Sequence, residues 1–157
     1  MGFYLAQLLT GLANASSLFL IASGLSIIFG VTRIVNFAHG SFYMLGAYIA
    51  YTLVTTLQGG ILGFWGSVVM AAAAVGLIGL LIEVTILRRI YQAPELFQLV
   101  ATFGMVLIFQ DVTQYIWGAA DLLGPRAPGL DRAIRFMGEP IPEYDLALIV
   151  IGPMVLA

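Results

Sequence analysis

Apolar residues fill four long segments of the chain, and polar residues interrupt them at few positions. The segments cover about 3–30, 37–57, 61–87 and 96–117. None alternates apolar and polar residues as a barrel strand does, and each reaches the roughly 20 residues that a membrane-spanning helix needs. We therefore expect an all-α, polytopic transmembrane helix bundle, because helices satisfy their own backbone hydrogen bonds in lipid.

Residues 118–143 differ in character from these runs. The segment holds four of the six prolines, three arginines and four acidic residues, which indicates an extramembrane loop. Within it, IRFMGEPIP can form a short hairpin around Gly138. A fifth apolar run begins near 144 and reaches 157, which is too short for a complete span. We expect one transmembrane domain, 1–157, that is part of a longer protein.

Composition agrees with a membrane location. Hydrophobic residues make up 61% of the 157 residues and charged residues 9%, and the mean hydropathy is +1.04. Soluble domains carry roughly a quarter charged residues, and a small soluble fold cannot hide this much apolar surface. Membrane lipid is the expected surrounding. The net charge of −2 gives no reason to expect a nucleic-acid partner.

The chain lacks the residues of familiar catalytic and cofactor sites. It contains no cysteine, one histidine and scattered acids, so the sequence offers no disulfide framework, metal cluster or catalytic set. All six basic residues are arginine, and a P-loop needs a lysine. We expect no enzyme and no cofactor. If ATP drives this protein, another chain binds it.

Polar residues concentrate in one apolar region, GVTRIVNFAHGSF (30–42). One interpretation is an ordinary helical hairpin, with Arg33 at the interface and Asn36 as the N-cap of a helix beginning at Phe37. The other is a broken or re-entrant helix near residues 31–40, because VTRIVN is apolar and contains no turn dipeptide. Such breaks persist at membrane depth only beside protein or a cavity, and transporters build substrate sites from them.

Small residues on the third segment predict close helix packing. The residues concerned are Gly63, Ser67, Ala71 and Gly76. Packing within one bundle is the main interpretation, and a homodimer seam is the alternative. Glu83 is embedded in the same apolar run. It is expected to reach the headgroups or to pair with an arginine, Arg33 being a candidate; a role in transport is the alternative.

Two stretches carry a resemblance to a known family. They are GLSIIFGVTRIVNFAHGSFYMLGAYIAY (24–51) and LIEVTILRRIYQAPELFQLVATFGMVLIFQ (81–110). Both resemble the permease subunit of branched-chain amino acid ABC importers, of the LivH type, and the resemblance covers almost the whole chain as an N-terminal portion. It implies a multi-pass protein of the bacterial inner membrane. It also implies a second homologous permease subunit, two cytoplasmic ATPase subunits and a periplasmic substrate-binding protein.

The resemblance also favours a helix break beside the translocation path. It implies substrate-pathway roles for Asn36, Phe37, His39, Gly40 and Ser41. Two departures stand out: the ATPase-coupling helix of the family lies in a C-terminal half that this chain does not contain, and Arg88-Arg89 replaces a more usual arginine–proline pair.

Two other function classes stay open, and so does the orientation. An ATP-independent channel or secondary carrier for a small polar solute such as urea or an amide would need a coupling site, for which Glu83 and Asp111 are the candidates. A structural subunit would have no path of its own. The arginines divide equally between the two membrane sides, and we favour the side of Arg88-Arg89 as cytoplasmic.

Overall fold

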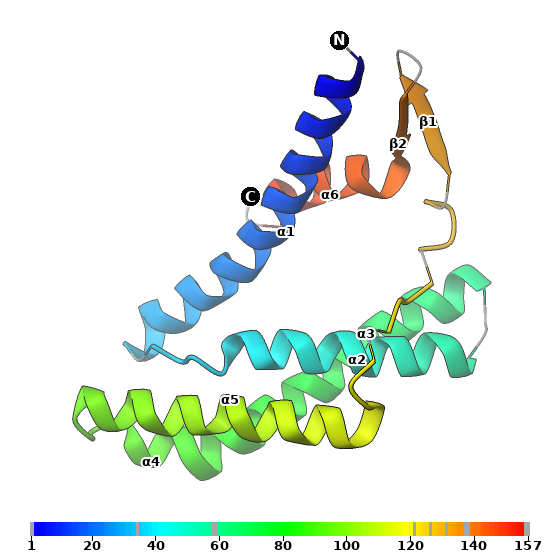
Figure 1. Ribbon diagram of the computed structural model, residues 1–157. Helices are drawn as coiled ribbons and strands as arrows, with labels where there is room; N and C mark the ends of the chain where they lie inside the picture. Colours follow the sequence, from blue (N-terminus) through cyan, green and yellow to red (C-terminus); the bar gives the residue numbers. More distant parts are fainter. Residues whose placement is uncertain are drawn as a thin grey trace. The chain divides into compact units, whose positions relative to one another are not determined.

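Four long helices follow the four apolar segments in the part of the chain that the computed structural model describes: residues 2–33, 35–57, 60–120, 122–125, 127–130, 132–136 and 139–155. They are α1 (Gly2–Thr32), α2 (His39–Leu57), α3 (Gly60–Ile82) and α5 (Glu95–Trp117) (Figure 1). A π-helical turn, η1 (Glu83–Leu87), and the short α4 (Arg88–Ile90) continue α3. The predicted all-α membrane bundle is confirmed. Gly138, around which the hairpin is expected, and Ile34 of the VTRIVN stretch lie outside the described residues.

Three of the helices are long and apolar enough to cross a membrane, counting only the described residues. They cover Gly2–Val31, Gly60–Ile90 and Glu95–Trp117. Helix α2, expected as the second span over 37–57, is not among them. Tyrosines and threonines lower its hydropathy. The hydroxyls of Thr52, Thr55 and Thr56 donate to carbonyls of their own helix, which satisfies them in apolar surroundings.

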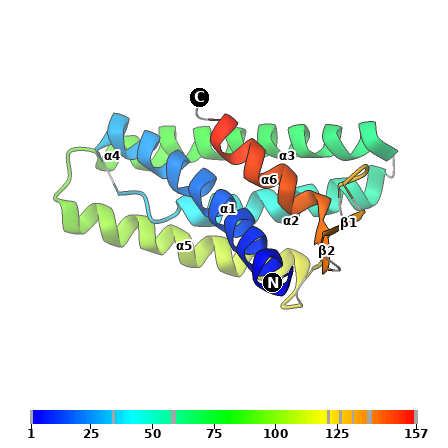
Figure 2. The same ribbon diagram turned by 90° about the horizontal axis from the view of Figure 1, so that it is seen from above.

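The chain divides into two units, and each is described by itself. The larger unit is Leu25–Pro125. In it α2 lies beside both α3 and α5 (Figures 1 and 2). Its core contains Ala38, Leu45, Leu87, Met105 and Phe109. The α2–α5 contact includes an edge-on ring pair, Phe42 with Phe109, and a hydrogen bond of 2.8 Å from the Trp117 indole to the Thr52 hydroxyl.

Close approach of α3 to α2 depends on small side chains. Ser67 and Ala71 are 0% and 3% exposed, and the Ser67 hydroxyl donates to the Gly63 carbonyl at 2.7 Å. Val75 follows Ala71 by four residues on α3. A Cβ added at Gly46 of α2 would lie 3.5 Å from its side chain. Gly76 lies off this row, with nothing of the described chain within 4 Å of an added Cβ. Burying small residues lets the two backbones approach, as expected in lipid.

The smaller unit combines Met1–Gly24 with Arg126–Ala157. Strands β1 (Ala133–Phe136) and β2 (Glu139–Pro142) pair antiparallel, and this confirms the hairpin expected in the loop. Helix α6 (Glu143–Met154) follows and packs on the first half of α1. A Cβ added at Gly152 would lie 2.9 Å from the Ser16 Cβ, so only glycine fits there without a shift.

Candidate functional site at the helix break

The helical backbone stops between α1 and α2. Arg33 has a φ of 57°, a left-handed conformation that ends a helix and is uncommon for a residue with a side chain. Its N–H still donates to the Phe29 carbonyl at 2.8 Å. Helix α2 begins at His39, two residues later than the predicted start at Phe37. Phe37 and Ala38 form a turn instead, because Asn36 bonds across them.

Asn36 caps the break. Its side-chain oxygen accepts the Ala38 N–H at 3.0 Å, and its carbonyl accepts the His39 N–H at 3.1 Å. The Ala38 carbonyl in turn accepts the N–H groups of Ser41 and Phe42. Asn36 is 6% exposed and Ala38 is fully buried. The Asn36 side chain thus accepts one backbone N–H, as expected from the sequence, but it closes a turn before α2 and is not the N-cap of a helix that begins at Phe37.

The break lies among packed side chains and not at a free helix end. Ala38 belongs to the same buried cluster as Leu87 and Met105. Met105 follows the start of α5 at Glu95 by ten residues, or roughly 15 Å of helix. At Asn36 and Ala38 the break is thus buried among packed side chains, while the neighbouring Val35 and Phe37 are exposed.

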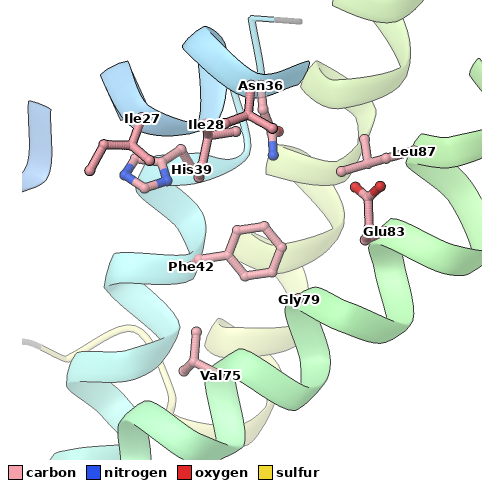
Figure 3. A pocket seen from close by; sticks show the side chains of 10 residues that line it. Ile27, Ile28, Asn36, His39, Phe42, Val75, Gly79, Glu83 and Leu87 are labelled. Atoms are coloured by element: carbon pink, nitrogen blue, oxygen red, sulfur yellow. The ribbon is translucent and has the colours of Figure 1, made fainter. Parts of the chain in front are cut away.

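A pocket of about 510 Å³ opens beside the break. Its polar lining side chains are Asn36, His39 and Glu83 (Figure 3). The remaining lining residues are apolar: Ile27, Ile28, Val31, Phe42, Val75, Gly79 and Leu87. The pocket thus combines apolar walls with three polar groups that come from the break, the start of α2 and η1, the usual character of a small-molecule site.

The predicted pathway residues divide into two groups. The structure brings Asn36 and His39 together at the pocket. Phe37, Gly40 and Ser41 are not lining residues: Phe37 is exposed and Ser41 is buried. Gly40 has nothing of the described chain within 4 Å of an added Cβ.

Glu83 reaches the pocket from the first residue of the π-helical turn. Its carboxylate points toward the end of the pocket where Asn36 and Leu87 lie (Figure 3). It accepts a hydrogen bond from the Tyr91 hydroxyl, so the pair with Arg33 stays a prediction. Burial, then the hydrogen bond to Glu83 and its charge, raise the pKa of Tyr91 to about 12. The phenol therefore keeps its donor proton at neutral pH.

Gln98 closes the α4–α5 connection next to this end of the pocket. It is 9% exposed, and its amide nitrogen donates to the carbonyls of Ile90, Tyr91 and Ala93 at 3.2, 3.2 and 2.9 Å. One side chain thereby shares its two N–H groups among three carbonyls at and beyond the end of α4, of which that of Ile90 also accepts the Ala93 N–H. Sequence reasoning missed this role; the available signal is an amide in the first turn of an apolar helix.

Sequence reasoning did not assign Val75 and Gly79 of α3 to the site, whereas Glu83, the first residue of η1, was already a candidate. All three residues continue the four-residue spacing of Ser67 and Ala71. That spacing was the signal for one shared face. Among the described residues, no group of three or more histidine or acidic side chains could hold a metal ion.

Comparison with known proteins identifies the family. The family described as the branched-chain amino acid transport system permease component matches residues 7–154, which is nearly the whole chain. The chain belongs to this permease family. The helix break and the residues that line its pocket lie within the matched residues, and the resemblance seen at 24–51 and 81–110 is confirmed.

Curated relatives agree with this assignment. The high-affinity branched-chain amino acid transport system permease protein LivH of Escherichia coli K12 is 30% identical over 132 residues, covering 78% of this chain and 42% of LivH. The corresponding protein BraD of Pseudomonas aeruginosa is 34% identical over 113 residues, covering 69% of this chain and 37% of BraD. The chain thus spans about two fifths of the length of these relatives. No solved structure matches it significantly.

Proposed function

We propose that this chain forms part of the permease subunit of an ATP-binding-cassette importer for branched-chain or related amino acids. The observation that carries the proposal is membership of the permease family over residues 7–154. The names of LivH and BraD, both high-affinity branched-chain amino acid transport permeases, support the substrate class.

The pocket at the helix break supports a substrate pathway in this region. Discontinuous helices build substrate sites in transporters, and the N-terminus of α2 offers a partial positive charge to an anionic group. Asn36 holds the break and His39 lines the pocket. Phe37, Gly40 and Ser41 complete the proposed pathway segment, in which Gly40 leaves room for a neighbouring chain or solute.

The proposed importer contains several further subunits. A second homologous permease subunit completes the membrane part, two cytoplasmic ATPase subunits hydrolyse ATP, and a periplasmic substrate-binding protein delivers the solute. The assembly lies in the inner membrane of a bacterium.

Uptake by the assembled importer in proteoliposomes tests the proposal. Leucine uptake is expected to require both ATP and the binding protein. Uptake that continues without ATP would contradict the importer and favour a channel or secondary carrier.

Substitutions at the break test the pathway. Asn36→Ala and His39→Ala in the full-length permease are each expected to reduce leucine uptake about tenfold at normal membrane levels, because the break and the pocket lining change. Asn14→Ala, at an exposed amide of α1, is the matched control and should retain uptake. Normal uptake by both break variants would leave the segment a purely structural role.

A further inference from the structure

Glu83 is an acidic side chain in a pocket whose walls are mostly apolar. An ionised carboxylate at membrane depth is costly unless a cation or several donors offset its charge. The hydrogen-bond partner recorded for Glu83 among the described residues is the Tyr91 hydroxyl, which is neutral. A carboxylate has about four acceptor positions, so one neutral donor leaves most of its capacity unused.

The groups around the pocket complement the parts of a hydrophobic amino acid. Ile28, Val75 and Leu87 provide apolar walls for an aliphatic side chain. The start of α2 beside Asn36 contributes the positive end of the helix dipole for a carboxylate, although the N–H groups of His39, Ser41 and Phe42 already donate within the chain. The ammonium group of the amino acid would pair with a carboxylate in the same pocket, and Glu83 is the acidic residue that lines it.

We propose that Glu83 binds the ammonium group of the transported amino acid and thereby selects solutes that carry one. This inference rests on the proposed importer function. Tyr91 is a positioning residue, since its hydroxyl holds the Glu83 carboxylate without neutralising it.

Ligand analogues that lack one charged group test the assignment. Binding of labelled leucine to the purified, complete permease complex is measured without the binding protein, and two probes compete with it. Isoamylamine keeps the side chain and the ammonium group, whereas 4-methylpentanoate keeps the side chain and the carboxylate. Each competition is repeated with Glu83→Gln, which preserves shape and removes the charge.

Glu83→Gln is expected to weaken competition by leucine and by isoamylamine at least tenfold, or about 1.4 kcal/mol. Competition by 4-methylpentanoate should not weaken, because this probe offers nothing to the carboxylate. Glu95→Gln, at an exposed acid that does not line the pocket, is the matched control and should change neither probe. Glu83→Asp should recover part of the preference for isoamylamine.

Two results separate this inference from the importer proposal. If wild-type vesicles take up leucine with ATP while Glu83→Gln leaves competition by isoamylamine unchanged, the Glu83 assignment is wrong and the importer stands. Equal losses for both probes would also overturn it, since they indicate a distorted pocket. If wild-type vesicles show no amino acid uptake, the importer proposal itself fails, and this inference fails with it.

Discussion

The contact between α2 and the continuous helix of α3 and η1 has two regions along one row of residues. Around Ser67 and Ala71, which we call the closed level, side chains are tightly packed; around Gly79 and Glu83, the open level, a pocket is present. At Ser67 and Ala71 the side chains are almost fully buried. At Gly79 and Glu83 the same four-residue spacing continues, yet these residues line a pocket of about 510 Å³. A spacing pattern by itself therefore does not separate packing from a site.

The closed and open levels differ because different residues of α2 face the row on α3. Near Val75, at the edge of the pocket, α2 has Gly46, and a Cβ added there would already touch Val75 at 3.5 Å. Near Gly79, α2 presents the Phe42 ring, 4.0 Å from an added Cβ. Beyond Phe42 the helical backbone has given way to the break, and the missing turn of helix leaves space that Asn36 and His39 border.

The largest effect is expected from overfilling the closed level. Ala71→Leu adds bulk where Ala71 is 3% exposed, and overpacking a tight interior costs about 1–3 kcal/mol. We expect a clearly lower unfolding temperature in detergent and less assembled importer. Ala72→Leu is the matched control, since Ala72 is exposed and adds bulk toward lipid. Equal unfolding temperatures for the two variants would show that this level is not closed.

A smaller effect on stability but a clear effect on transport is expected at the open level. Gly79→Leu extends into the pocket, whereas Gly79→Ala only reaches van der Waals distance of Phe42. We expect Gly79→Leu to assemble normally and to lose more than tenfold of leucine uptake, and Gly79→Ala to retain most of it. Gly76→Leu, at a position with open space around it, is the control. If Gly79→Leu transports normally, the pocket does not belong to the pathway.

The sequence predicted the long helices because lipid imposes a minimum length and an apolar composition on each membrane span separately. It also predicted that the Asn36 side chain accepts a backbone N–H, because that interaction is local: the bond comes from an N–H two residues further along, in the turn before α2. The start of α2 shifted by two residues for the same reason, since the turn that Asn36 closes occupies Phe37 and Ala38.

The pocket lining was harder to predict because it depends on which faces of the helices meet. Helix α3 is apolar on all sides, so hydropathy does not reveal its buried face. The π-helical turn at Glu83–Leu87 then changes the helical register. The partners of Tyr91 and Gln98 depend on the path of the loop before α5, which no periodic pattern specifies.

The smallest effect is expected when the hydrogen bond from Tyr91 to the Glu83 carboxylate is removed and the carboxylate itself is kept. Tyr91→Phe removes one hydrogen bond and keeps the ring, so it should lower the free energy of unfolding by about 0.5–1.5 kcal/mol at pH 7. Leucine uptake should fall two- to threefold at most, in contrast to the losses expected from Gly79→Leu. Denaturation in detergent and uptake in vesicles measure the two effects.

The pH dependence of Tyr91→Phe sharpens this test. The folded protein holds the pKa of Tyr91 at about 12, against 10.0 in the unfolded chain. The unfolded state therefore releases this proton first, so the contribution of Tyr91 to stability is complete below pH 10 and is lost as the pH rises toward about 12. Wild type should lose more stability than Tyr91→Phe over this interval, because the other tyrosines titrate in both proteins. Parallel losses would show that the hydroxyl does not hold the Glu83 carboxylate in the folded membrane protein.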